Sequence, residues 1–208
     1  MERPVLSQIR DSTLLSDRHE RIVEAAISVF LEKGFHVATT HDVAKRAGIS
    51  QSNLYNYVRS KSDILFMVCE RVVGLYIHAL DDAQERHTSS RARLVESIRA
   101  MIRIMYEHRR ELRLLYNEVH SLGPRDRKVI MSRILELNSR FADLIGNYES
   151  DHQPLPRLNR KLAANLVSFV PTVVSLRAWD LRDVPCDEQE NGILDFILAG
   201  LGISDSPG

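Results

Sequence analysis

Residues 38–61 read Ala-Thr-Thr-His-Asp-Val-Ala-Lys-Arg-Ala-Gly-Ile-Ser-Gln-Ser-Asn-Leu-Tyr-Asn-Tyr-Val-Arg-Ser-Lys, and their spacing predicts two short helices joined by a tight turn. Thr39 can cap the first helix, and Asp42 stands three residues later as its capping-box partner. Gly48 can take the left-handed backbone conformation that a tight corner requires, and Ser50 can cap the second helix. This is the pattern by which a small domain projects one helix into the major groove of DNA.

The second helix of this pair has one apolar face and one polar face. Leu54 and Val58 are four residues apart and fall on the buried face. The outward face carries short amide and hydroxyl side chains and one tyrosine: Gln51, Ser52, Asn53, Tyr55 and Asn56. Side chains of this kind at a helix N-terminus are suited to reading base edges. The sequence therefore predicts a helix-turn-helix that binds DNA.

The surrounding residues strengthen this interpretation. Residues 20–66 run from Glu-Arg-Ile-Val-Glu-Ala-Ala through Gly-Phe, Asp-Val-Ala-Lys-Arg-Ala-Gly-Ile-Ser and Leu-Tyr-Asn-Tyr to Ser-Lys-Ser-Asp-Ile-Leu-Phe. This highly specific series resembles the N-terminal domain of the TetR (tetracycline-repressor-like) family. It covers about a quarter of the chain, and the remainder resembles the family in length and helical pattern. Ser52 stands where the family often has Gly, and Val58 where it often has Phe; both suit a helix, so they concern the operator sequence rather than the fold.

The resemblance implies roles for nine residues of this region. The residues that look like base readers are Gln51, Ser52, Asn56 and, from the preceding helix, His41. Tyr55 would contact either a thymine methyl group or a phosphate. The residues that look like phosphate anchors are Thr39, Asn53, Tyr57 and Lys61; core packing is the alternative for Tyr57. Gln and Asn can pair bidentately with adenine, whereas phosphate contacts only set the register.

Composition describes an ordinary globular protein. Of the 208 residues, 44% are hydrophobic and 27% are charged, and no run of about 18 apolar residues predicts a membrane span. The first residues lack the apolar stretch of a secretory signal. Cys69 and Cys186 lie far apart beside apolar neighbours, which favours reduced thiols over a disulfide or metal pair. We therefore expect a cytoplasmic protein.

Charge does not single out nucleic acid as a partner, because the formal net charge is zero. Affinity for DNA would have to come from a local patch and from two copies that bind together. The cations near the motif are Arg18, Arg21, Lys45, Arg46, Arg59 and Lys61.

Apolar periodicity predicts an all-α fold of about nine helices, without strand alternation. The expected organisation is a flexible arm over residues 1–16, a three-helix DNA-binding domain over residues 17–63, and a helical ligand-binding and dimerisation bundle over residues 64–208. The expected helices and breaks are a first helix from Arg18 to Lys33, a long helix from the Ser60 cap to Arg86, a helix opened by Ser89-Ser90, a helix ended by Gly123-Pro124, a longer helix opened by Pro124, a loop over 149–157, a helix from Leu158 to Leu181 kinked at Pro171, and a last helix over 187–202.

The last two helices carry more apolar surface than one neighbour can cover, since residues 166–176 are apolar on nearly every face. A two-fold contact between copies is the natural outlet, and core helices of a monomer are the alternative. The family resemblance implies a four-helix dimer interface from these helices. Its expected members are Val173, Leu194, Ile197, Leu198 and Leu201.

The C-terminal part is larger than DNA reading requires, which favours an effector site in the bundle. The side chains expected to line it are Tyr76, Met101, Met105, Tyr116, His120, Phe141, Phe169 and Trp179, with plain core packing as the alternative. Residues 111–124 faintly resemble TetR-type regulators of fatty-acid and acyl-CoA catabolism. Arg109, Arg110 and Arg113 could contact the phosphates of a CoA ester, or they could simply be solvated charges.

These patterns predict a homodimeric transcriptional repressor that binds a near-palindromic operator and is released by a small hydrophobic or acyl-CoA-type effector; activation stays open. A DNA-binding architectural or assembly protein without a ligand is the alternative. An enzyme is not expected, because the chain has no phosphate-binding glycine loop and no His-Glu-x-x-His. The series Gly48-x-Ser50-x-Ser52 lacks the second glycine of a nucleophile elbow. We expect no cofactor and no metal.

Overall fold

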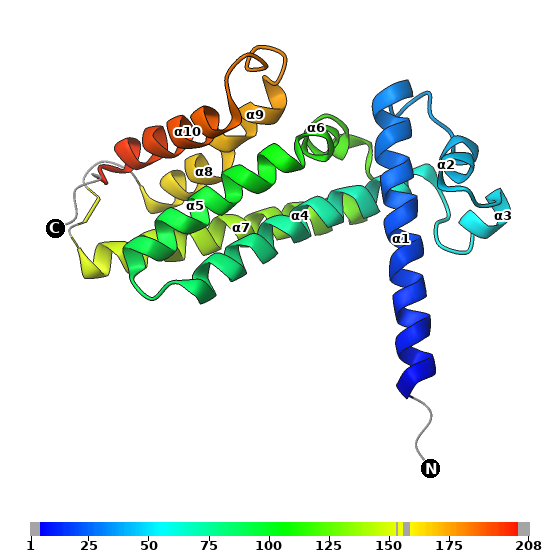
Figure 1. The fold of residues 1–208 in the computed structure, drawn as a ribbon, viewed down its shortest axis with the longest axis horizontal. Helices are drawn as coiled ribbons and strands as arrows, with labels where there is room; N and C mark the ends of the chain where they lie inside the picture. The colour runs from blue at the N-terminus through cyan, green and yellow to red at the C-terminus, as the bar shows by residue number, and fades with distance from the viewer. Residues whose placement is uncertain (1–4, 153, 156–158, 204–208) are drawn as a thin grey trace. The chain divides into compact units, whose positions relative to one another are not determined.

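The computed structural model describes residues 5–152, 154, 155 and 159–203, and the side chains among them from Asp17 onward. Within these ranges the chain is α-helical and holds no strand, as predicted. The helices of the N-terminal half are α1 (Val5–Lys33), α2 (Thr40–Ala47), α3 (Gln51–Leu54), α4 (Lys61–Arg86) and α5 (Ser90–Glu107). Those of the C-terminal half are α6 (Arg109–Glu118), η1 (Val119–Ser121), α7 (Pro124–Asp151), α8 (Arg160–Phe169), η2 (Val170–Thr172), α9 (Val173–Leu176) and α10 (Cys186–Leu201), where η marks a 3-10 turn (Figure 1).

The chain divides into two compact units. The first comprises residues 1–70 and 114–127, and the second comprises residues 71–113 and 128–208. The first unit therefore holds the whole of the predicted DNA-binding region, together with a segment from the middle of the chain that the sequence did not group with it.

The first unit is built around the apolar face of α1. Ile22, Val29 and Phe30 are buried, as their helical spacing predicts. The ring of Phe30 meets Phe35 edge to face, with centroids 5.1 Å apart. Helix α2 packs against α1, and α3 packs against α2.

Helix α1 begins at Val5, earlier than the Arg18 start that the periodicity predicts. Residues 5–16 are thus helical where the sequence predicts an irregular arm, while residues 1–4 lie outside the described part. The segment contains neither glycine nor proline, so the helix nucleated by the amphipathic part can propagate towards the N-terminus.

In the second unit, α5 is the helix on which the C-terminal helices pack. It contacts α8, η2, α9 and α10 (Figure 1). Its inner face carries Leu94, Ile98, Met101, Ile102 and Met105, all buried. The pair Arg99 and Arg103 on α5 binds Glu190 on α10, at 2.9–3.0 Å. Apolar burial and one ionic contact therefore hold α10 against α5.

Several predicted helix ends are confirmed. Ser89 caps α5 by accepting a hydrogen bond from the Ala92 N–H at 3.2 Å, and Pro124 opens α7. The predicted kink at Pro171 is the 3-10 turn η2, because proline has no N–H to donate within a helix. Segments α8, η2 and α9 follow without a gap, so counting them as one irregular helix gives nine helices in the described chain. This run ends at Leu176, before the predicted Leu181.

The sequence also predicts reduced cysteines and no membrane-spanning helix. Cys69 is buried and Cys186 is exposed, and both are free thiols. Burial raises the pKa of Cys69 to about 12, so it is an inert core residue. Among the described residues, no helix combines the length and apolarity needed to span a bilayer.

Candidate nucleic-acid interface

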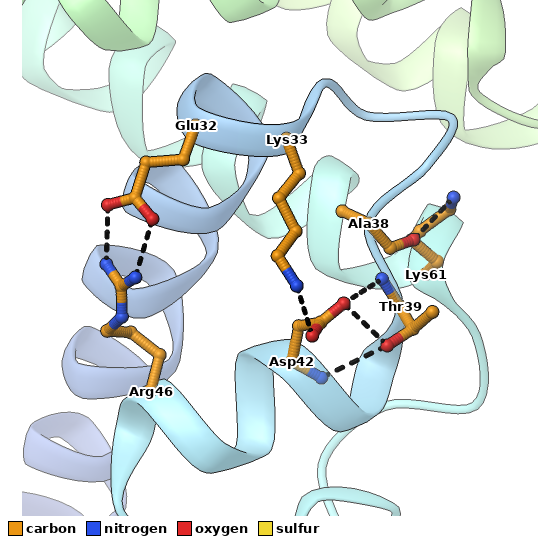
Figure 2. Close-up of polar contacts among 7 residues, drawn as sticks. All are labelled: Glu32, Lys33, Ala38, Thr39, Asp42, Arg46 and Lys61. Carbon is orange, nitrogen blue, oxygen red and sulfur yellow. Dashed lines mark hydrogen bonds and ion pairs between the residues drawn. The ribbon is translucent and has the colours of Figure 1, made fainter.

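The start of α2 is fixed by the predicted capping box. The Thr39 hydroxyl accepts a hydrogen bond from the Asp42 N–H at 3.1 Å, and the Asp42 carboxylate accepts one from the Thr39 N–H at 3.0 Å (Figure 2). The same carboxylate also accepts from the Thr39 hydroxyl at 2.8 Å. These reciprocal bonds satisfy donors that a helix start otherwise leaves free.

The corner between α2 and α3 depends on Gly48. Its φ of 67° and ψ of 34° are left-handed, as predicted. Its N–H reaches the Lys45 carbonyl at 3.2 Å, and Arg21 donates to the Ala47 carbonyl at 2.9 Å. Ser50 then caps α3 by accepting from the Asn53 N–H at 3.1 Å. These hydrogen bonds therefore fix the direction in which residues 51–57, the recognition segment, follow α2.

Helix α3 is shorter than expected, because it ends at Leu54 and continues as a turn through Tyr57. Leu54 and Val58 are nonetheless buried, as predicted. The exposed residues are Gln51, Ser52, Tyr55 and Asn56, joined by Thr39 and His41 of the α2 start; Asn53 and Tyr57 are half-buried. The polar edge that the sequence predicts thus faces solvent, and its contacts with bases stay a prediction.

Thr40 organises this edge, although sequence reasoning did not single it out. Its hydroxyl shares a hydrogen bond with the Tyr55 hydroxyl at 3.2 Å and accepts one from the Gln51 amide at 3.5 Å. The pKa of Tyr55 is lowered, first by its hydrogen bond with Thr40 and then by a side-chain hydrogen bond with Gln51. The available signal was its place directly after the Thr39 cap, at the first position of α2.

Two ion pairs clamp α2 to the end of α1. Glu32 binds Arg46 in a bidentate pair at 2.9 and 2.6 Å, and Lys33 binds Asp42 at 2.6 Å (Figure 2). The hydrogen bond from Lys33 is the main reason why the pKa of Asp42 is lowered, and bonds from Thr39 add to it. Sequence analysis placed Arg46 among the cations near the DNA-binding motif, but its guanidinium is paired with the Glu32 carboxylate.

Lys61 holds the loop before α2. Its ammonium donates to the Ala38 carbonyl at 2.8 Å (Figure 2) and to the carbonyls of Phe35 and His36 at 2.6 and 2.9 Å. It also lies 4.7 Å from the Phe35 ring centroid. An ammonium has three N–H donors, so this set occupies all of them. Lys61 therefore positions the loop, and the predicted phosphate contact would require it to release a carbonyl.

Tyr57 packs against α1. Its hydroxyl accepts a hydrogen bond from Arg18 at 2.9 Å, and its ring meets the edge of His19 with centroids 5.5 Å apart. Because Tyr57 is half-buried and its hydroxyl lies beside a cation, both of its predicted roles, core packing and a phosphate contact, stay open.

The eight predicted effector residues are divided between the two units and differ in their exposure. Tyr76, Met101, Met105 and Phe141 are buried in the core of the second unit, whereas Phe169 and Trp179 are 54% and 67% exposed. Tyr116 and His120 belong to the first unit. Two hollows of the second unit, of about 180 and 250 Å³, are lined by other side chains, among them Arg103 and Glu107. The effector site stays a prediction.

The predicted dimer residues lie mostly inside their own subunit. Leu194, Ile197, Leu198 and Leu201 are at most 5% exposed because α10 packs on α5 and α8, and Val173 is half-buried. The exposed apolar side chains of these helices are Leu162, Leu166, Phe169 and Phe196. The sequence did not separate these four exposed residues from the core, and the dimer interface stays a prediction.

Comparison with known proteins agrees with this geometry. A model of bacterial regulatory proteins of the tetR family matches residues 22–68, and a model of tetracyclin repressor-like C-terminal domains matches residues 87–170, so together they cover more than half of the chain. The transcriptional activator FasR of Mycolicibacterium smegmatis is 26% identical over 203 residues, which span 96% of this chain and 90% of FasR.

Solved structures share the fold. A tetR-family regulatory protein from Rhodococcus RHA1 has a TM-score of 0.81 at 20% identity, covering 90% of this chain and 98% of that one. FadR from Bacillus subtilis, solved in complex with stearoyl-CoA, has a TM-score of 0.73 at 17% identity, covering 87% and 98%. These relatives are regulators rather than enzymes. With its capped helix-turn-helix and its helical C-terminal bundle, this chain belongs to the TetR family of bacterial transcriptional regulators.

Proposed function

We propose that this protein is a homodimeric, ligand-responsive repressor that binds a near-palindromic DNA operator and leaves it when a small hydrophobic or acyl-CoA-type effector binds. The observation that carries the proposal is the solvent-exposed polar edge beginning at Gln51, held by the capped corner at Gly48. A rigid, exposed amide and hydroxyl edge is what direct base readout requires.

Specificity would come from the exposed readers Gln51, Ser52 and Asn56, with His41 from α2. Register would come from Thr39, Asn53 and Tyr57 on phosphates, with Tyr55 on a thymine methyl or a phosphate. Lys61 would join them by releasing one carbonyl of the loop before α2. Each bidentate base contact is worth about 1–3 kcal/mol of discrimination. Gln51→Ala is therefore expected to relax preference at one position of each half-site.

Dimerisation would use the exposed apolar face of α8 and α10. Leu162, Leu166 and Phe169 follow at spacings of four and three residues, so they share one face of α8, and α8 contacts α10. On α10, Phe196 lies exposed between Gly192 and Gly200, where a partner helix can approach closely. A two-fold contact here would set two recognition segments at half-sites about 34–36 Å apart, or a multiple of it.

The effector class is supported by the relatives and by the charges of α6. FadR was solved with stearoyl-CoA, and Arg109, Arg110 and Arg113 are exposed cations suited to CoA phosphates. Because Met101 and Met105 are closed in the core, an acyl chain would have to separate helices of the bundle to enter. Such a step can shift DNA affinity only through different affinities for two states, typically by about 1–3 kcal/mol.

Activation is the second candidate, because FasR is an activator.

The first experiment tests DNA recognition: the purified protein selects duplexes from a random pool, and fluorescence anisotropy measures how tightly it binds them. A repeated inverted motif is the expected result, and failure to enrich any duplex would overturn DNA recognition. Adding stearoyl-CoA, free fatty acids and aromatic compounds then tests the effector: weaker operator binding supports release, and no response to any of them supports the ligand-free architectural alternative. Transcription from a promoter carrying the enriched motif separates repression from activation.

A further inference from the structure

A small cationic hollow lies in the first unit between α1 and the α2–α3 corner. Its volume is about 110 Å³, and its walls include Arg18 and Arg21 from α1 and Asn53 and Tyr57 from the recognition segment. Ile22 and Ile49 supply apolar lining. A hollow of this size has room for a few water molecules, each of which takes about 30 Å³ in the liquid.

The partners of Arg18 and Arg21 differ from those of Arg46, Arg103 and Arg160. Arg46 is bound to Glu32, Arg103 to Glu190 and Arg160 to Glu149, so each of those charges is neutralised. Arg18 instead donates to the Tyr57 hydroxyl, and Arg21 to the Ala47 carbonyl, both at 2.9 Å.

Both of those partners are neutral, and no carboxylate is among the described residues that line the hollow. The spacing of three residues also puts both guanidinium groups on one face of α1. The hollow thus concentrates positive charge without an internal counterion.

The hollow adjoins the base-reading edge. Asn53 and Tyr57, which line it, lie on the same short segment as Gln51 and Ser52. A guanidinium has five N–H donors in a planar fork that matches phosphate oxygens, and the described bond of Arg18 uses one of them. An anion placed here would therefore meet two charged forks, an amide and a phenol beside the segment that reads bases.

We propose that Arg18 and Arg21 seat a phosphate of the DNA backbone in this hollow, so that the protein–DNA interface extends onto helix α1. The proposal rests on the DNA binding proposed above and adds a contact outside the helix-turn-helix pair. A seated phosphate would fix the register of the recognition segment and release counterions from the duplex.

The test is the salt dependence of binding to a labelled duplex of roughly 30 base pairs, about three helical turns. Each phosphate neutralised adds about 0.9 to the steepness of log K against log salt, measured between about 50 and 200 mM. Arg18→Gln is expected to reduce this slope by about 0.9 for each half-site, which is about 1.8 for the dimer, and to weaken every sequence alike. Arg18→Lys is expected to keep the slope, and Arg182→Gln, which removes an exposed charge from the second unit, is expected to leave binding unchanged.

Circular dichroism checks that each variant folds, and Arg21→Gln is measured as a second variant in case Arg18→Gln does not. Unchanged slopes for the folded Arg18 and Arg21 variants would overturn the inference while leaving DNA binding intact, whereas a wild type that binds no duplex would overturn the proposed function itself. Inorganic phosphate is also titrated into the DNA-free protein. If it binds there and the variants lose it while their DNA slopes stay the same, the hollow serves a free phosphate and the DNA proposal is wrong.

Discussion

Lys61 and Arg46 both lie near the recognition segment, yet the structure uses both charges within the chain. Lys61 donates to three carbonyls of the loop before α2, and Arg46 binds Glu32. Formal charge in a sequence therefore overstates what is available to DNA. At the scale of single residues, an ammonium surrounded by carbonyls is first a positioning group.

Replacing Lys61 with methionine is expected to lower the free energy of unfolding by about 1–3 kcal/mol, because three carbonyls lose their charged donor. Lys45→Met, at an exposed lysine of α2, is the matched control and is expected to change stability by no more than about 0.5 kcal/mol. Urea unfolding followed by circular dichroism measures both. Equal effects of the two substitutions would show that the Lys61 contacts contribute nothing specific.

Asp42 predicts a pH dependence of stability. Hydrogen bonds from Lys33 and Thr39 lower its pKa in the folded state, so the unfolded chain takes up a proton first, near the ordinary value of about 3.9. The stabilisation is therefore complete above this pH and is lost as the pH falls from about 3.9 towards the folded pKa. Unfolding by guanidinium from neutral pH down to about pH 3 should show the stability gap between wild type and Asp42→Asn narrowing only at the acidic end. A stability difference between the two proteins that stays constant across this pH range would contradict the lowered pKa of Asp42.

Among the elements, those whose ends are set by local chemistry could be predicted from the sequence. The Thr39–Asp42 capping box, the Ser50 and Ser89 caps and the Pro124 start all depend on residues within four positions of each other. The Glu32–Arg46 clamp could not be predicted, because it joins side chains 14 residues apart whose meeting depends on the angle between α1 and α2. The long N-terminal part of α1 escaped prediction because it lacks an amphipathic pattern.

Gly48 tests the corner between α2 and α3. Gly48→Ala is expected to destabilise the protein by about 1–2 kcal/mol, because a Cβ is disfavoured at its φ of 67°. Space is not the cause, since the new Cβ would lie 3.5 Å from the Arg21 guanidinium, an ordinary contact.

The control is Gly74→Ala within α4, where a Cβ would have no neighbour within 4 Å and φ is not left-handed. There the substitution is expected to stabilise by about 0.5–1 kcal/mol. Thermal unfolding of both variants gives the comparison, and destabilisation by Gly74→Ala of the same size would refute a conformational cause at Gly48.

At the scale of the whole molecule, the sequence predicts which helices are rich in apolar residues but not which side each presents to its own core. Helix α10 is apolar on two sides: Leu198 is 4% exposed and Phe196, two residues earlier, is 69% exposed. Periodicity treats both as apolar, and only the packing of α10 on α5 and α8 distinguishes them. The same limit applies to the predicted effector residues, where Met101 fills the core and Trp179 lies exposed.

This distinction gives opposite predictions for two substitutions on one helix. Phe196→Glu places a charge on the exposed face, so the folded subunit should keep its thermal stability as a monomer while the dimer dissociates. Leu198→Glu buries a carboxylate without a partner and should instead destabilise the subunit by several kcal/mol. Sedimentation velocity measures association, and circular dichroism measures folding. Fluorescence anisotropy on the selected duplex should show that Phe196→Glu loses the tight binding that two linked half-sites provide. If Phe196→Glu stays dimeric, the seam lies elsewhere; if Leu198→Glu dissociates while folded, α10 turns its other side to the partner.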